Sequence, residues 1–418
     1  MKKFCSILLL LSFLGLAYHS SAASDPDLPF KQAVSVKYKI PPILKGAKLK
    51  KLVIDYNDVV YVLSDKGLYR VNGQELVKDL RYTPLAGKNP LDIAVQDGAG
   101  HLYYLYEDKV LTNGYAGVPY TILPKGKYNK FAVAADGSML LAGDQSIGFI
   151  RENKLSEIAV SQNEQIRNVY IHDGIFYALG GQVLYRYSGD HLLPLHKSND
   201  IKTVAFDKNE IIIGTANGYY GIHNTSGNIT FALQNKVPAT NISYMMVAGG
   251  NLWAGTDGGA FMKEAAGAYR YYASKRWLND DHVTSLAADS KGNMYCLTLT
   301  GLNKIEFLTQ TLSQKTAYYQ DKIRQRHIRY GLISEVFFEK PGDINAAEMK
   351  DTDNDGLWSS FYLGSQAFRY GVTKEKIAKR YAWESFEAFE RLLSVNPLKG
   401  FPSRTFERTG FRNSDPEA

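Results

Sequence analysis

The feature that most constrains the fold of this 418-residue chain is an internal repeat of about forty residues. In each unit an apolar strand, a turn rich in Gly, Asp or Asn, a second apolar strand and another turn follow one another. In the three clearest units a glycine lies six residues after an aromatic residue: Tyr61 and Gly67, Trp253 and Gly259, Tyr295 and Gly301. Such units do not bury their apolar faces alone, so they must pack against one another.

Looser copies of the unit fill the chain between residues 61 and 295. The equivalent positions are Tyr61, Tyr103, Leu141, Tyr177, Ile212, Trp253 and Tyr295. The steps between them run from 35 to 42 residues, which is room for the four short strands of one propeller blade. Period-two alternation and the Asp-Gly, Asn-Gly and Gly-Gly turns exclude a helical solenoid of similar period. The sequence therefore predicts a seven-bladed β-propeller over residues 49–308.

The N-terminus has the order of a secretory signal peptide. Lys2 and Lys3 precede an apolar run over 7–17, and small residues follow at 21–23. We therefore expect 1–23 to be a cleaved signal peptide and 24–48 an N-terminal segment. The apolar run is too short to span a bilayer, and no later stretch approaches that length. The prediction is a periplasmic or secreted protein with no membrane span.

Only Cys296 would remain in such a mature chain, so no internal disulfide is expected. Cys296 follows a strand pattern and is predicted to lie in the core.

After residue 308 the pattern becomes helical. Thr311 and Gln314 form a capping-box pattern, and the helix that they open is expected to run to Arg329, with Gly331 as its terminal glycine. Two more helices are expected, over about 357–370 and 373–394. The predicted fold class is thus mainly β, a seven-bladed propeller followed by a short all-α segment over 309–418.

Three helices with wide apolar faces cannot close a core alone. They must lie on the propeller, pair with another chain, or begin a larger helical domain.

The best repeat, residues 251–259 (NLWAGTDGG), resembles the repeat of two-component regulator propeller proteins, which are common in Bacteroidota. The resemblance covers about 50–308. It implies an extracytoplasmic propeller, in many members a ligand-binding sensor domain ahead of a membrane helix and a kinase. Neither element follows here, so the resemblance does not extend to a signalling role.

A second resemblance concerns the C-terminal segment. Residues 326–331, 351–358, 384–391 and 400–404 are similar to the entry of an (α/α) toroid of the six-hairpin glycosidase type. That architecture needs many more than three helices. The resemblance therefore implies an incomplete toroid, and we expect the chain to be a truncated member of a longer family.

Alternating acids precede the second expected helix. Asp351, Asp353 and Asp355 match the first half of a calcium loop, but Tyr362 stands where that loop needs its last acid. Two other interpretations stay open: the acids cap the helix, or they form a sugar-facing cluster with Trp358 at the mouth of the toroid. No cofactor is predicted, with calcium at these three aspartates as the alternative.

Two groups of side chains suggest ligand sites. Arg326 and His327 lie in an Arg-rich stretch that suits a uronate or sulfate, although a helix bridging two domains is the favoured interpretation. Tyr272 and Arg276 could line a sugar site in the propeller or serve β-elimination of uronates. Other residues considered for that site are Tyr271, Trp277, His172 and His282. The alternative for the aromatic residues is packing between blades.

Several functions lose their support because their motifs are absent from the sequence. There is no phosphate-binding P-loop, HExxH, GxSxG or CxxC motif. The aromatic residues alternate along strands and do not interleave with basic stretches, so nucleic acid is not an expected partner.

The sequence favours an extracytoplasmic binding module that holds a carbohydrate or docks a protein partner through its C-terminal helices, and that is not a complete catalyst. The alternative is a carbohydrate-active enzyme with a truncated helical domain. A polysaccharide lyase would need a converging His, Tyr and Arg cluster, and a glycosidase would need paired carboxylates. A third hypothesis is an assembly role, which predicts an exposed apolar patch on residues 357–393.

Overall fold

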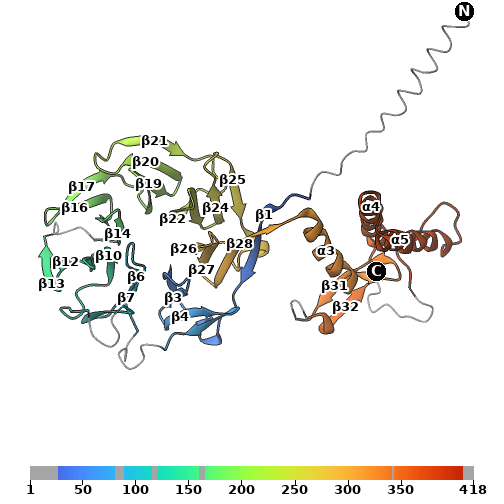
Figure 1. Ribbon diagram of the computed structural model, residues 1–418, viewed down its shortest axis with the longest axis horizontal. Helices are drawn as coiled ribbons and strands as arrows, with labels where there is room; N and C mark the ends of the chain where they lie inside the picture. The colour runs from blue at the N-terminus through green and yellow to red at the C-terminus, as the bar shows by residue number, and fades with distance from the viewer. Residues whose placement is uncertain (1–26, 81–88, 115–119, 160–164, 341–342, 408–418) are drawn as a thin grey trace, which may run out of the picture. The chain divides into compact units, whose positions relative to one another are not determined.

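The computed structural model describes residues 27–80, 89–114, 120–159, 165–340 and 343–407 (Figure 1). The predicted signal peptide, 1–23, lies outside the described residues. The chain divides into two compact units. One comprises residues 32–308, and the other combines residues 309–418 with the segment that ends at residue 31.

The first unit is a ring of seven four-stranded sheets, which confirms the predicted propeller (Figure 1). Blade one consists of β2 (Leu49–Ile54), β3 (Val60–Ser64), β4 (Gly67–Asn72) and β5 (Glu75–Lys78). Blade two consists of β6 (Asp92–Val95), β7 (Leu102–Leu105), β8 (Lys109–Thr112) and β9 (Thr121–Ile122). Blade three consists of β10 (Lys130–Val133), β11 (Met139–Ala142), β12 (Ile147–Arg151) and β13 (Lys154–Ile158).

The next blades repeat this order. Blade four consists of β14 (Asn168–His172), β15 (Ile175–Leu179), β16 (Val183–Ser188) and β17 (His191–Lys197). Blade five consists of β18 (Thr203–Asp207), β19 (Glu210–Thr215), β20 (Gly218–His223) and β21 (Ile229–Gln234). Blade six consists of β22 (Ile242–Ala248), β23 (Asn251–Thr256), β24 (Gly259–Lys263) and β25 (Tyr269–Tyr272). Short helices η1 (Pro42–Leu44) and α2 (Ser274–Trp277) lie in connections.

The seven positions that defined the sequence repeat occupy the second strand of the seven blades. Their side chains are all buried, from 0% exposed at Tyr61 to 7% at Tyr295. The period of the sequence repeat therefore corresponds to one buried position in the second strand of each blade. A large side chain there packs between neighbouring sheets and stabilises the blade by removing apolar area from water.

Blade seven is completed by the N-terminal segment. It contains β26 (Val283–Ala288), β27 (Met294–Thr298) and β28 (Leu302–Gln310), and its outer strand is β1 (Phe30–Lys37). Figure 1 shows β1, in blue, beside β28, in orange. The backbone N–H of Tyr38 also donates to the carbonyl of Leu302 at 3.1 Å. The first strand of the chain thus closes the ring, so the expected boundary at residue 49 leaves out one strand of the propeller.

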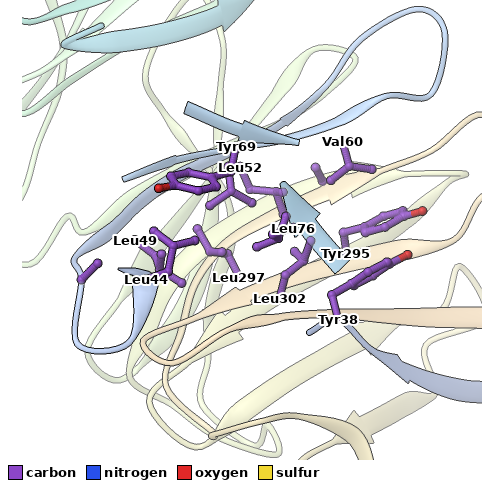
Figure 2. Packing of buried hydrophobic residues seen from close by; sticks show 13 residues of the cluster. Tyr38, Leu44, Leu49, Leu52, Val60, Tyr69, Leu76, Tyr295, Leu297 and Leu302 are labelled. Atoms are coloured by element: carbon purple, nitrogen blue, oxygen red, sulfur yellow. The ribbon is translucent and has the colours of Figure 1, made fainter. Parts of the chain in front are cut away.

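The junction between blades one and seven has a continuous apolar core (Figure 2). Tyr38 stacks on Tyr295 with ring centroids 6.1 Å apart, and Leu297 and Leu302 pack beside Leu44. The predicted core cysteine, Cys296, is buried and free in the neighbouring cluster between blades six and seven.

The second unit begins with helix α3 (Leu312–Arg326). Its predicted capping box is confirmed, because Gln314 N donates to Thr311 Oγ1 at 3.2 Å and Thr311 N donates to Gln314 Oε1 at 2.9 Å. The helix ends at Arg326 rather than Arg329. Gly331 is not its terminal glycine, because Tyr330 and Gly331 turn, at φ 52° and 91°, between β29 (Ile328–Arg329) and β30 (Leu332–Ile333).

A second hairpin, β31 (Glu335–Phe338) and β32 (Ala347–Lys350), comes before the remaining helices. The short helix η2 (Ile344–Ala346) lies in the connection between its two strands. Helices α4 (Asp355–Thr373) and α5 (Lys376–Ser394) pack against each other. The two helices were predicted close to these limits, whereas the four short strands between 328 and 350 were missed. These elements do not confirm the start of an (α/α) toroid.

Candidate functional site

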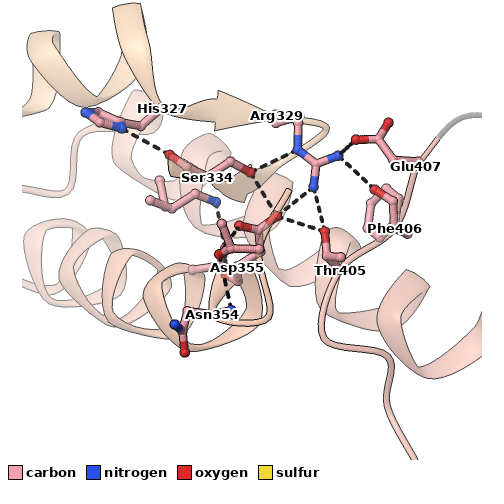
Figure 3. Close-up of polar contacts among 11 residues, drawn as sticks. His327, Arg329, Ser334, Asn354, Asp355, Thr405, Phe406 and Glu407 are labelled. Atoms are coloured by element: carbon pink, nitrogen blue, oxygen red, sulfur yellow. Dashed lines mark hydrogen bonds and ion pairs between the residues drawn. The ribbon is translucent and has the colours of Figure 1, made fainter. Parts of the chain in front are cut away.

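The acidic residue at the start of α4 lies inside the C-terminal unit (Figure 3). Asp355 is 0% exposed. Its Oδ2 accepts hydrogen bonds from Arg329 Nη2 at 2.6 Å, Thr405 Oγ1 at 2.8 Å and Ser334 Oγ at 3.0 Å. The carboxylate therefore makes its hydrogen bonds within the protein and is not accessible to a ligand.

Arg329 completes this buried cluster. Its Nε donates to Ser334 Oγ at 3.0 Å and its Nη1 to the carbonyl of Phe406 at 3.0 Å, and it forms an ion pair with Glu407 (Figure 3). Both charges of a buried pair need such partners, because each loses its hydration. The cluster ties the strand at 329, the start of α4 and the chain near 405 together, so its role is structural.

The other two aspartates do not join Asp355 around a metal. Asp353 pairs with Arg404 at 2.5 Å on the surface, and Asp351 is half-buried. Within the described ranges no group of three or more His, Cys, Asp or Glu side chains is placed to hold a metal ion. The calcium loop is therefore not assembled. The N-cap is Asn354, which makes no capping bond through its side chain, whereas Asp355 stands in the first turn, where a negative charge favours the helix dipole.

The basic residues near the end of α3 make separate contacts. Arg326 lies over the ring of Phe338, 5.6 Å from its centroid, and His327 Nδ1 is 3.1 Å from the carbonyl oxygen of Ser334. Arg324 pairs with Glu384 at 3.0 Å. Arg324 and Arg329 thus form ion pairs with acids inside this unit, and the basic side chains do not converge on one anion site. Trp358 is half-buried on α4.

Of the predicted propeller residues, Tyr272 and Trp277 pack in the core between blades six and seven, whereas Tyr271 is 46% exposed. Tyr272 is buried, its ring centroid is 5.5 Å from that of Trp253, and Trp277 meets it edge-on. Burial raises the pKa of Tyr272 to about 12, so its hydroxyl is a poor base. Arg276 covers the ring of Trp277 from the solvent side, 5.5 Å from its centroid.

The histidines considered with them belong elsewhere. His172 stacks on Phe206 and its Nε2 is 3.1 Å from the carbonyl oxygen of Lys208, at the junction of blades four and five. His282 is exposed before β26. The His, Tyr and Arg residues named from the sequence therefore form no common cluster.

A different site opens between blades three and four. It is a cavity of about 290 Å³ formed by the β10–β11 turn, β12, the β14–β15 turn and β16. Its lining residues are Ala134, Ala135, Asp136, Ser138, Phe149, Arg151, Gly174, Ile175, Phe176, Arg186 and Tyr187. We call it the blade 3–4 cavity. It lies between neighbouring blades.

Aromatic rings form one side of the blade 3–4 cavity. Phe149 lies 5.8 Å from Phe176 in an edge-on contact and 4.6 Å from Tyr187 in a tilted one, measured between ring centroids. The three rings also belong to, or pack against, the apolar core that joins blades three and four. Phe149 and Phe176 are buried, 5% and 4% exposed, so packing in the core restrains the positions of these two rings.

Charged side chains lie at the exposed part of the same cavity. The guanidinium of Arg151 is 5.2 Å from the centroid of the Phe149 ring, and it has no salt bridge to a described residue. Ser138 donates to Asp136 Oδ1 through its backbone N–H at 2.9 Å and its hydroxyl at 2.6 Å. These bonds, with a smaller contribution from Arg151, hold the pKa of the Asp136 carboxyl below its usual value.

Phe149 of β12 and the charged residue Arg151 at its end are visible in the sequence. Nothing in the sequence, however, indicates that blade four places Tyr187 opposite them, because the two strands are joined only through the packing of blades.

Comparisons with known proteins identify the fold. No protein-family model matches the sequence, and no match was found among curated proteins. Among solved structures, the extracellular domain of the putative hybrid two component system BT4673 from B. thetaiotaomicron matches with a TM-score of 0.51 at 18% identity, over 66% of this chain and 39% of that one. This chain thus spans well under half of that structure.

Two lyases match over their whole length. Streptogramin B lyase gives a TM-score of 0.53 at 9% identity, over 67% of this chain and 98% of that one. Virginiamycin B lyase from Staphylococcus aureus gives 0.52 at 12% identity, over 67% and 100%. These likenesses show the propeller fold that the repeat predicted. Because the fold occurs in extracellular domains and in enzymes alike, it does not by itself choose a function.

Proposed function

We propose that this protein is an extracytoplasmic binding module whose propeller holds an acidic carbohydrate in the blade 3–4 cavity. The observation that carries the proposal is the position of Arg151, which lies over the Phe149 ring at a cavity wall of three aromatic side chains. Among the described residues this guanidinium forms no salt bridge, so it is available for the carboxylate of a ligand.

The remaining groups suit the rest of such a ligand. Small-molecule sites combine apolar and aromatic walls with a few polar groups that fix orientation. The rings of Phe149, Phe176 and Tyr187 offer that wall, and the ionised Asp136 can accept hydrogen bonds from sugar hydroxyls. A uronic acid residue has the carboxylate, the hydroxyls and the ring that this set of groups would contact.

A periplasmic or secreted location is part of the proposal. It is supported by the signal-peptide pattern at 1–23 and by the likeness to extracellular domains. In the described part of the chain, no helix is both long enough and apolar enough to cross a membrane.

Binding is better supported than catalysis at this cavity. A uronate lyase needs a side chain that removes a proton. The Tyr187 hydroxyl donates to Asp190 at 2.9 Å, and burial and this bond raise its pKa to about 12, so it is not prepared for that role. A glycosidase needs two carboxyl groups across the ligand, and among the described lining residues Asp136 is the one carboxylate.

Calorimetric titration with oligouronates and with neutral oligosaccharides of equal length tests the proposal. We expect the acidic series to bind and the neutral series to bind more weakly. Arg151→Gln should lower the affinity for oligouronates about tenfold or more, the loss of one charged hydrogen-bonded contact. Arg276→Gln is the matched control, because Arg276 also lies over an aromatic ring but outside the cavity. Equal losses in both variants, or no binding of any acidic saccharide, would contradict the proposal.

A further inference from the structure

Helix α4 carries an exposed apolar stripe. Its members are Leu357, Phe361, Phe368 and Val372, which are 54%, 70%, 80% and 74% exposed. At 3.6 residues per turn these four side chains fall in one narrow sector of the helix. The buried residues of α4 lie on the other side: Asp355, Ser359, Tyr362 and Gln366. We call this sector the α4 stripe.

Large apolar side chains this exposed seldom form a continuous stripe on a surface that has no partner. The α4 stripe agrees with the patch expected for an assembly role on residues 357–393. The groove of about 320 Å³ between α4 and α5 is a separate feature, because its lining residues Leu363, Ala367 and Tyr370 lie on the side of α4 that faces α5.

The spacing within the α4 stripe is symmetric. The steps from Leu357 to Phe361, to Phe368 and to Val372 are 4, 7 and 4 residues. In an antiparallel pair of identical helices with the twofold axis between residues 364 and 365, Phe361 faces the second Phe368 and Leu357 faces the second Val372. A twofold interface must present the same patch from both copies, and this stripe does so.

The centre of the stripe permits close approach. Gly364 and Ser365 stand at its midpoint, and a Cβ atom added to Gly364 would meet nothing within 4 Å. Gly371 is open in the same way. Small residues at a helix crossing let two backbones approach, while the flanking phenylalanine side chains fill the space on either side.

The charges at the two ends of α4 complement one another in the same arrangement. Asp351 precedes the helix, and Asp353 beside it is already paired with Arg404. Lys374 and Lys376 follow the helix, and Glu375 between them pairs with Arg369. Antiparallel pairing brings the acidic end of one copy beside the basic end of the other, and it also opposes the two helix dipoles. Within α4 the charged residues are Asp355, which is buried, and Arg369, which pairs with Glu375.

We propose that the α4 stripe is the interface of a twofold homodimer, in which α4 packs antiparallel against α4 of a second copy. A partner other than a second copy would also need apolar residues at the right spacing. It would not explain why the spacing within the α4 stripe is the same from either end. The inference does not depend on the ligand of the propeller.

Sedimentation or light scattering of the full chain tests the dimer. We expect twice the chain mass for the wild-type protein, and one chain mass for Phe361→Glu and for Phe368→Glu. Phe401→Glu is the matched control, because Phe401 is 67% exposed but lies outside the stripe, and it should stay dimeric. Circular dichroism checks that every variant is folded. A wild-type monomer at every concentration, or a dimer that survives Phe368→Glu, would overturn the proposal.

Cross-linking tests the antiparallel arrangement separately. In a Cys5→Ser chain, where Cys296 is buried, we expect Leu357→Cys and Val372→Cys to remain uncross-linked alone under mild oxidation. An exchanged mixture of the two should form a disulfide-linked dimer. Efficient cross-linking of Leu357→Cys with itself would mean that the helices are parallel, and it would overturn the twofold antiparallel model.

Discussion

Arg329 Nη2 donates to Asp355 Oδ2 at 2.6 Å, and both side chains are buried in the C-terminal unit. This ion pair joins residues from a short hairpin and from the start of α4. Asp355, one of the three alternating aspartates, is therefore committed to a partner inside the protein. A buried pair with all its hydrogen bonds made holds elements in place, and its removal has a cost that an exposed pair lacks.

Asp355→Ala should therefore lower the opening free energy of α4 by about 3–5 kcal/mol, because it leaves Arg329 buried without its main partner. Hydrogen exchange of the α4 amides measures this unit separately from the propeller. The matched variant is Asp353→Ala, which removes an exposed pair with Arg404 and should cost about 1 kcal/mol or less. Equal effects of the two variants would mean that Asp355 is not the structural group described.

Cys296 should be inert to thiol reagents in the folded protein. It is 0% exposed, and burial raises the pKa of its thiol to about 12, so the reactive thiolate is nearly absent at neutral pH. In a Cys5→Ser chain, labelling across a urea series should follow the unfolding of the propeller measured by circular dichroism. Labelling at urea concentrations well below that transition would show that blade seven opens by itself.

The pKa of Asp136 should rise when its hydrogen bonds are removed. Because the folded-state pKa lies below the ordinary 3.8, the carboxylate stabilises the fold above that value, and the contribution disappears as the pH falls through the lowered pKa. Ser138→Ala removes the bond from the hydroxyl, the largest cause, and should return the pKa toward 3.8. NMR titration of the carboxyl carbon measures the shift, and Ser156→Ala on β13 serves as a control. An unchanged pKa in Ser138→Ala would contradict the assigned cause.

Removal of β1 should destabilise the propeller more than removal of the residues before it. A chain that starts at residue 39 leaves the outer edge of β28 unpaired, and we expect a lower melting temperature and self-association through that edge. A chain that starts at Phe30 keeps the strand and should melt like the longer form. If the two truncated chains melted alike, β1 would not be the element that closes the ring.

The propeller was predictable because its information is local and repeated. One large buried side chain recurs in the second strand of every blade, from Tyr61 to Tyr295, and the turns between strands use Gly, Asp and Asn. The capping box at Thr311 and Gln314 is local too, and it is formed. Patterns of this kind depend on neighbours a few residues apart, so a single sequence displays them.

The remaining features depend on residues far apart in the chain. Pairing of β1 with β28 joins the beginning of the propeller to its end, and Arg329 contacts partners at 355 and 405. The blade 3–4 cavity likewise needs Arg151 from one blade and Tyr187 from the next. No short sequence pattern predicts contacts between residues so far apart in the chain. The spacing of the aspartates at 351, 353 and 355 likewise does not reveal that Asp355 is buried against Arg329.

The pairing of β1 with β28 also determines when the propeller ring can close during folding. A ribosome makes β1 near the start and β28 only when residue 302 and those after it have been added. During all of that time the strand has no partner, and six blades can form while the circle stays open. Closure is then a late, long-range step, and until it occurs each new molecule exposes two unpaired strand edges to its neighbours.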